Sequence, residues 1–304
     1  MRPGTHGRAG ALVLAAPALA EAHANQPLAP HDLWTAWSFD PWVVIPMAIA
    51  AWLYARGVAR LRRAGDSAYR PGAWRVQAFW WGLIGLAAAL VSPIDALGGV
   101  LFSGHMVQHE ILMLVAAPLL VAGRPRIPFL WGLPEGWRHA GAPLLRLRQP
   151  RRLWATITTP FAAWALHGLA LWIWHLPVLY EATLRSDLVH TLQHSSFFGS
   201  TLLFWWALLE HRSSREGYGL GFLYVFTTAV HSSILGALLT FAPTVWYPSY
   251  AGTTAAWGLT PLEDQQLGGL LMWVPAGVLY VISALFLFTA WMHGPSRRTL
   301  SVEP

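Results

Sequence analysis

The chain has 304 residues, 55% of them hydrophobic and 11% charged, which excludes an ordinary soluble domain and indicates a polytopic membrane protein. Its formal net charge is +6, and every positive side chain other than His is Arg, because the sequence contains no Lys. The absence of Cys excludes disulfides, thiolate metal sites, cysteine nucleophiles and c-type heme attachment. The Arg residues lie in loops between apolar segments, so membrane topology explains them better than a nucleic-acid-binding surface does.

Residues 1–24 resemble a secretory signal peptide. Arg2 and Arg8 precede a short apolar run at 11–20, and small residues follow it. The run is too short to cross a bilayer as a helix. We therefore expect this segment to be removed, which leaves residues 25–304 as a single membrane domain.

Seven apolar stretches are long enough to cross a bilayer, for which a helix needs about 20 residues. They are predicted at residues 40–59, 75–93, 99–122, 157–177, 189–209, 219–241 and 267–292. Proline within some of these stretches is tolerated when neighbouring helices pack around it. The fold class predicted is therefore all-α, a polytopic membrane helix bundle with about seven transmembrane helices.

The distribution of Arg predicts the orientation of the bundle. Arg residues are concentrated after the first, third, fifth and seventh stretches, whereas the loops on the opposite side contain Arg185 alone. Because positive loops stay on the cytoplasmic side, we expect the N-terminus outside and the C-terminus in the cytoplasm. The expected location is the bacterial plasma (inner) membrane, as a multi-pass protein in contact with the lipid bilayer.

A His-x-x-Gln-His pattern occurs twice, each time near the start of an apolar stretch. The first copy runs from His105 to His109 and the second from His190 to His194. On a helix, residues four apart lie on one face with Cβ atoms about 5–6 Å apart. Histidine inside a membrane is costly and usually faces a bundle interior or a polar cavity with a function. The two pairs lie at matching depth, so they predict a metal or heme site near the outer face.

Other side chains in the outer half of the bundle extend this candidate site. The predicted metal ligands are His105, His109, His190, His194, His175 and His231. Additional or hydrogen-bonding roles are predicted for Gln108, Gln193, Met106, Asp264 and His167. Imidazole suits copper, zinc, iron and nickel, and a Met thioether shifts the preference toward Cu(I).

Structural alternatives exist for the histidines and for Met106. A single membrane histidine such as His167 or His231 is commonly an interhelical hydrogen-bonding residue, and His175 could anchor its helix at the membrane interface. The paired motifs could tie helices together, but such polar contacts contribute only about 0.6 kcal/mol on average. Met106 could serve packing alone. Four clustered histidines are better explained by a bound metal or heme.

Several catalytic motifs are absent from the sequence. His109-Glu110 is followed by Met113 at the position where a zinc metalloprotease helix requires His. The sequence also lacks a Walker loop, a Gly-x-Gly-x-x-Gly turn and a Gly-x-Ser-x-Gly elbow. We therefore expect neither a hydrolase nor a nucleotide-driven pump. The protein is expected not to be an enzyme.

A longer set of motifs resembles a known family. The segments are Ser92-Pro93-Ile94-Asp95, the first histidine motif, Ala116-Ala117-Pro118-Leu119-Leu120, His175-Leu176-Pro177, the second histidine pair, Tyr247-Pro248-Ser249-Tyr250-Ala251 and Asp264-Gln265-Gln266-Leu267-Gly268-Gly269. Together they resemble the multi-spanning CtaG family of cytochrome c oxidase assembly factors, first associated with caa3-type oxidases. The resemblance covers roughly residues 40–292. It implies a seven-span plasma-membrane protein that assembles heme–copper oxidase and handles copper at the outer face.

Three functional hypotheses follow from these observations. The first is a copper chaperone that passes the metal to heme–copper oxidase subunits or to another copper carrier. The second is a heme b protein that transfers electrons, with His ligands from facing helices. The third is a permease, which would need polar residues that continue to the cytoplasmic side. Homo-oligomerisation is left open by the sequence.

Overall fold

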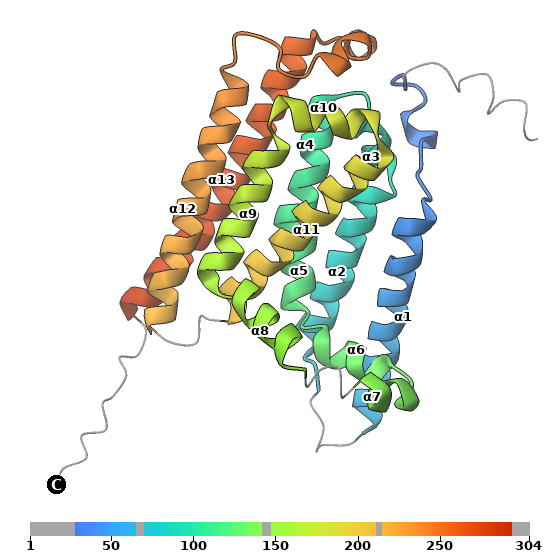
Figure 1. Ribbon diagram of the computed structural model, residues 1–304, viewed down its shortest axis with the longest axis vertical. Coiled ribbons are helices and arrows are strands. Elements are labelled where there is room, and N and C mark those ends of the chain that lie inside the picture. The colour runs from blue at the N-terminus through green and yellow to red at the C-terminus, as the bar shows by residue number, and fades with distance from the viewer. Residues whose placement is uncertain (1–27, 65–69, 142–146, 211–214, 294–304) are drawn as a thin grey trace, which may run out of the picture.

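The computed structural model describes residues 28–64, 70–141, 147–210 and 215–293, and the predicted signal segment 1–24 lies outside them. Within these ranges the chain forms helices and no strand. The helices pack side by side along a common direction (Figure 1). The prediction of an all-α membrane helix bundle is confirmed.

The elements follow one another with short connections. The first half contains η1 (Leu33–Thr35), α1 (Pro41–Arg63), α2 (Ala73–Leu90), α3 (Pro93–Gly98), α4 (Phe102–Glu110), the π-helical η2 (Ile111–Ala116), α5 (Ala117–Ala122), α6 (Arg126–Gly132) and α7 (Glu135–Gly141). The second half contains α8 (Arg148–Ile157), α9 (Pro160–Trp174), α10 (Pro177–Arg185), α11 (Asp187–Glu210), α12 (Arg215–Thr240), η4 (Pro248–Gly252), η5 (Thr254–Trp257) and α13 (Pro261–His293).

Several helices begin where a capping side chain precedes proline. The Asp40 side chain accepts a hydrogen bond from the Trp42 amide ahead of α1, and Ser92 accepts one from the Ile94 amide ahead of α3. Proline at the first helical position loses no helix hydrogen bond, because that amide has no partner within the helix. The sequence therefore fixes these starts locally.

Among the described residues, four helical segments have the length and hydropathy of a membrane crossing: Pro41–Arg63, Phe102–Ala122, Gly217–Thr240 and Pro261–His293. The pair α9 and α10, bent by 75° at its junction, would make a fifth. The protein is therefore a multi-pass membrane protein. The count of seven crossings and the side on which each terminus lies stay predictions.

The third apolar stretch is one continuous helical segment with a π-helical middle. It comprises α4, η2 and α5, and Pro118 lies in the first turn of α5. Proline has no amide hydrogen and its ring crowds the preceding turn, so the hydrogen-bonding pattern changes ahead of it. π-Helical turns of this kind often occur beside functional sites.

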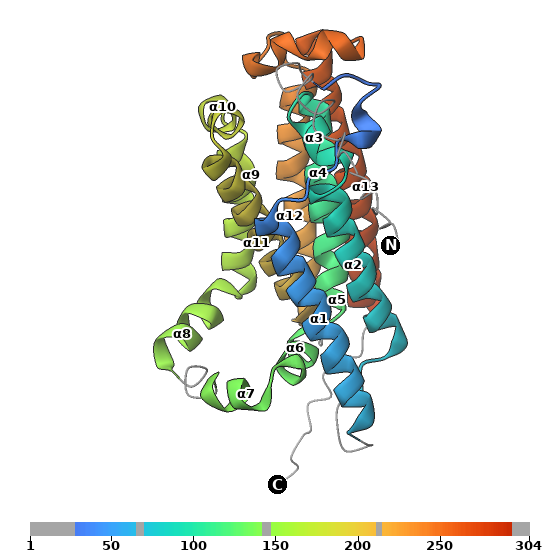
Figure 2. The same cartoon turned by 90° about the vertical axis from the view of Figure 1, so that its right-hand side faces the viewer.

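The two ends of the bundle differ. The short helices α3 and α10 and the η4–η5 segment lie at one end, and α6, α7 and α8 lie at the other (Figures 1 and 2). Helix α6 packs closely on α1, since a Cβ atom added at Gly57 would lie 1.8 Å from the carbonyl oxygen of Pro128. The end with α3 and α10 carries both histidine motifs.

Candidate metal centre

Helices α4 and α11 bring the two histidine motifs together. The ring centroids of His105 and His194 are 5.4 Å apart, those of His109 and His194 are 5.3 Å apart, and those of His105 and His190 are 5.7 Å apart. We call His105, His109, His190 and His194 the four-histidine cluster. Its members come from both copies of the motif.

Three members of the cluster are spaced for one metal ion. One ring nitrogen from each of His105, His109 and His194 lies within 4.8 Å of the others. Metal–nitrogen distances are about 2.0–2.1 Å, so ligands around one ion lie within about 4 Å of one another. Small side-chain rotations would bring these nitrogens into that range. The donor set, three or four imidazoles without a thiolate, suits copper or zinc.

The ring nitrogens of the cluster are not fully satisfied by protein groups. Both ring nitrogens of His109 and Nδ1 of His194 are buried without a hydrogen-bond partner among the described residues. The Nε2 atoms of His190 and His194 are 2.7 Å apart, so one ring donates to the other. Buried polar atoms are nearly always paired, and the unpaired nitrogens here are those that a metal ion would engage.

His175, the C-cap of α9, lies at the edge of the cluster. Its ring centroid is 6.4 Å from that of His109. Its Nδ1 lies 2.6 Å from the carbonyl oxygen of Leu171, and because a carbonyl can only accept, Nδ1 carries the proton. The lone pair is then on Nε2, which is buried without a partner among the described residues. A hydrogen bond that fixes the tautomer in this way is typical of metal-binding histidines.

His231 and His167 lie in a second place, between α9, α11 and α12. A Cβ atom added at Gly168 on α9 would be 3.6 Å from Nε2 of His231. His167 Nδ1 is 3.4 Å from the Thr201 hydroxyl, and its ring packs against Phe197. The same Phe197 ring stacks on His109 at 4.5 Å. An aromatic side chain therefore lies between His167 and the four-histidine cluster.

The remaining predicted residues support the helices around the cluster. The side-chain nitrogen (Nε2) of Gln108 donates to the Ala89 carbonyl at 2.9 Å and to the Asp95 carboxylate at 2.8 Å. This side chain therefore connects α4 to α2 and α3. Gln193 is fully buried, and neither its side-chain nitrogen nor its side-chain oxygen has a hydrogen-bond partner among the described residues. Met106 is buried against α13, where a Cβ atom added at Gly268 would lie 3.3 Å from its Cγ.

Asp264 caps the helix that carries the first motif. Its carboxylate accepts hydrogen bonds from the amides of Phe102, at 2.7 Å, and Ser103, at 3.1 Å. It also accepts one from the Ser103 hydroxyl. These contacts engage both carboxylate oxygens at the positive end of α4, so Asp264 positions His105 and His109 through the helix.

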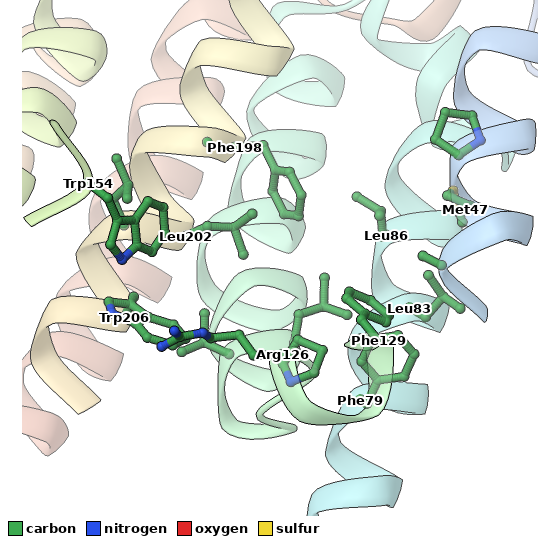
Figure 3. Close-up of a pocket in the computed structure, with 17 residues that line it drawn as sticks. Met47, Phe79, Leu83, Leu86, Arg126, Phe129, Trp154, Phe198, Leu202 and Trp206 are labelled. Atoms are coloured by element: carbon green, nitrogen blue, oxygen red, sulfur yellow. The ribbon is translucent and has the colours of Figure 1, made fainter. Parts of the chain in front are cut away.

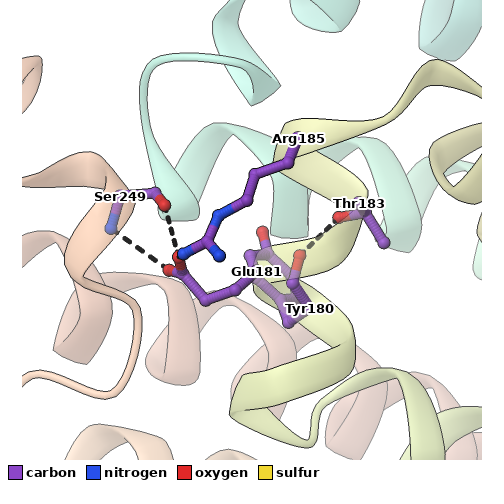
Figure 4. Close-up of polar contacts among 5 residues, drawn as sticks. All are labelled: Tyr180, Glu181, Thr183, Arg185 and Ser249. Atoms are coloured by element: carbon purple, nitrogen blue, oxygen red, sulfur yellow. Dashed lines mark hydrogen bonds and ion pairs between the residues drawn. The ribbon is translucent and has the colours of Figure 1, made fainter.

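A buried polar network covers the cluster at this end of the bundle. The hydroxyls of Tyr180 and Tyr250 are 2.9 Å apart, and the Tyr247 hydroxyl donates to the His175 carbonyl at 2.8 Å. Figure 4 shows Glu181 between α10 and η4, where its carboxylate accepts from the amide and the hydroxyl of Ser249. Burial raises the pKa of Tyr247 and that of Tyr250, so both phenols stay protonated.

An open vestibule leads from the surface to the cluster. It has a volume of about 350 Å³, and its polar lining residues include Ser38, Asp40, Asp95, His190 and His194. We call it the outer vestibule, after the predicted orientation of the bundle. Burial raises the pKa of the Asp95 carboxyl, although the hydrogen bond from Gln108 opposes this effect.

A larger cavity of about 580 Å³ lies further along the bundle and is lined almost entirely by apolar side chains (Figure 3). The Arg126 guanidinium lies on its wall, 5.0 Å from the ring centroid of Trp206. The cavity shares Pro46, Met47, Leu86 and Phe198 with the outer vestibule. It contains no member of the four-histidine cluster.

Glu110 is a buried acidic residue to which the sequence analysis assigned no role. Its side chain is 8% exposed, and both carboxylate oxygens lack a hydrogen-bond partner among the described residues. It ends α4, one residue after His109 and directly before the π-helical turn. The sequence could have indicated a role for Glu110 because it is a carboxylate within an apolar stretch. Such residues are rare in membrane helices and are usually functional.

Comparisons with known proteins identify one matching family and several relatives of this chain. A family described as cytochrome c oxidase caa3 assembly factor matches residues 52–294. Uncharacterized proteins of Mycobacterium bovis and Mycobacterium tuberculosis are each 27% identical over 278 residues, which cover 88% of this chain and 41% of the relative. One of Mycobacterium leprae is 23% identical over 269 residues, 86% of this chain and 40% of the relative. The chain therefore spans about two fifths of these curated relatives. No solved structure matches it.

Proposed function

Because the chain belongs to the cytochrome c oxidase caa3 assembly factor family, we propose that its four-histidine cluster binds copper and that the protein delivers this copper to a heme–copper oxidase. The observation that carries the proposal is the convergence of one ring nitrogen each from His105, His109 and His194 within 4.8 Å. Packing alone gives no reason to gather imidazoles in an apolar bundle, where each must be desolvated.

Copper fits this donor set better than the other common metals do. Calcium and magnesium prefer oxygen ligands, and no carboxylate belongs to the cluster of close ligand atoms. Imidazole binds copper, zinc and iron. A heme–copper oxidase contains copper and iron, but its iron enters as heme, so copper is the metal of this group that is delivered as an ion. Copper is the cargo in this proposal, so the cluster holds it with neutral imidazoles that can also release it.

Delivery requires that the metal leave the cluster for another protein. His190 and His194 are partly exposed to the outer vestibule, whereas His105 and His109 are fully buried. We infer that exchange takes place on the vestibule side of the bundle. The recipient is an oxidase subunit or a second copper carrier, met at the outer face of the bacterial plasma membrane.

Metal analysis of the purified full-length protein tests this proposal. The protein is loaded with Cu(I) under anaerobic conditions and washed, and its copper content is then compared with those of His105→Ala/His109→Ala and His190→Ala/His194→Ala. His231→Ala is the matched control, because it removes a membrane imidazole outside the cluster. We expect about one copper per chain in the wild type and the control, and loss of copper in both double variants. Equal copper content in all four proteins would contradict the proposal.

An optical spectrum of the same samples tests the heme b alternative. Heme bound by these histidines would give a Soret band that disappears in the double variants. The ring contacts favour a single ion, because His105 and His109 pack edge to face at 4.4 Å and Phe197 stacks directly on His109. A Soret band that depends on the cluster, together with absence of copper, would replace the copper proposal by the heme one.

A further inference from the structure

The outer vestibule joins acidic residues to the histidines of the cluster. Asp40 lies just before α1 and Asp95 lies on α3, and both line the vestibule together with His190 and His194. The Nδ1 atom of His194 is buried and has no hydrogen-bond partner among the described residues. The vestibule is therefore lined by a histidine that has one ring nitrogen without a hydrogen-bond partner among the described residues.

Asp95 connects the wall of the vestibule to the metal-binding helices. One of its carboxylate oxygens accepts the hydrogen bond from Gln108, which lies on α4 next to His109. The carboxylate also interacts electrostatically with His190 and with Asp40. It therefore lies near both Asp40 and His190.

The charges that face this path are mainly negative. Asp187, at the start of α11, also interacts with His190. Arg185, at the end of α10, forms an ion pair with Glu181 at 3.0 Å. A cleft with one sign of charge and low-dielectric walls raises the local concentration of ions of opposite charge and accelerates their association. Most of the other lining side chains are apolar, so they screen these carboxylates weakly.

We propose that the outer vestibule is the route by which copper cations reach the four-histidine cluster, and that Asp40 and Asp95 attract them along it. This inference rests on the proposed copper binding. It adds the side from which copper enters, the path that copper follows to the cluster and the positive charge of the copper species. Asp40 and Asp95 are positioning residues here, because neither belongs to the group of close ligand atoms.

Association kinetics test the route. Purified full-length protein is mixed with Cu(I), supplied anaerobically as its cationic acetonitrile complex, and the quenching of tryptophan fluorescence is followed by stopped flow. The variants are Asp40→Asn, Asp95→Asn and the double variant. Asparagine keeps an oxygen that can cap α1 or accept from Gln108, so the change removes charge with little loss of hydrogen bonding.

Asp32→Asn is the matched control. Asp32 precedes η1 on the same short segment as Asp40, forms no side-chain cap and does not line the vestibule. We expect the double variant to bind copper about tenfold more slowly at low salt, and the control to bind at the wild-type rate. The difference should vanish at about 1 M salt, where the Debye length is about 3 Å. The copper content at equilibrium should stay at the wild-type level.

The outcomes separate this inference from the proposed function. A double variant that loads at the wild-type rate at low salt would overturn the route, as would a control that slows equally. Loss of copper at equilibrium in Asp95→Asn would mean that Asp95 is a ligand or a structural residue, which also overturns the assigned role. Absence of copper binding by the wild-type protein would overturn the proposed function and this inference together.

Discussion

The Asp264 carboxylate accepts a 2.7 Å hydrogen bond from the backbone amide of Phe102, and this contact attaches the last long helix to the start of the helix that carries the first histidine motif. The first amides of a helix have no partner within the helix. A negative charge at this end is stabilising, both as a hydrogen-bond acceptor and through the helix dipole. The position of His105 therefore depends on a residue far away in the sequence.

Asp264→Ala should lower both stability and copper binding. We expect a loss of about 1–3 kcal/mol, because two buried amides of α4 lose their acceptor. Thermal unfolding in detergent and copper content measure the two effects. Asp264→Asn is the matched variant, and it should retain more copper than Asp264→Ala because its one amide oxygen can still accept from one of the two α4 amides. Equal copper content in wild type and Asp264→Ala would show that the cap does not position the cluster.

Glu181→Ala should destabilise the contact between α10 and η4 above the four-histidine cluster, whereas Arg185→Ala should change the stability of the protein little. The buried Glu181 carboxylate accepts a hydrogen bond from the Ser249 amide of η4, but the Arg185 side chain is 72% exposed. Removal of a buried hydrogen-bonding partner costs about 1–3 kcal/mol, and an exposed ion pair contributes about 0–1 kcal/mol. Melting temperatures of the two variants provide the comparison. A larger loss from the arginine variant would contradict the network drawn in Figure 4.

Gly57→Ala should separate α1 from α6. The added Cβ would lie 1.8 Å from the Pro128 carbonyl oxygen, a backbone atom that cannot turn away. Overpacking of this kind costs about 1–3 kcal/mol. Gly136→Ala on α7 is the control, because nothing lies within 4 Å of its added Cβ. Unfolding in detergent should show a loss for the first variant and no loss for the second, and equal stabilities would argue against this packing.

Asp95→Asn should be more stable than the wild type at neutral and higher pH, with a difference that narrows in acid. Burial raises the pKa of the Asp95 carboxyl above its ordinary value of 3.8, so the folded protein disfavours the carboxylate. This cost is complete above the raised pKa and absent below the ordinary one. Melting temperatures of both proteins across this range measure the difference, since other titrating groups are common to the two. A difference that widens in acid would contradict the assigned burial effect.

The sequence predicted the helical class and the pairing within each histidine motif, because both depend on local spacing. It did not predict the π-helical turn before Pro118 or the second location of His231 beside α9. Gln108 was predicted to have an additional or hydrogen-bonding role, and only the structure shows that its side-chain nitrogen donates to Asp95 and to the Ala89 carbonyl. Such roles depend on which neighbouring helix a side chain faces, and a single sequence leaves that undetermined.

By itself, the sequence determined that this chain enters a membrane as apolar helices and that each motif presents two imidazoles on one helical face. Only the tertiary structure decided that the two faces meet, that His175 joins their edge and that Asp95 lines the path to them. The physical reason is the distance along the sequence over which each kind of interaction acts. Hydropathy and helical periodicity act over a few neighbouring residues, whereas the contacts of His105 with His194 and of Asp264 with Phe102 exist only once distant helices have packed.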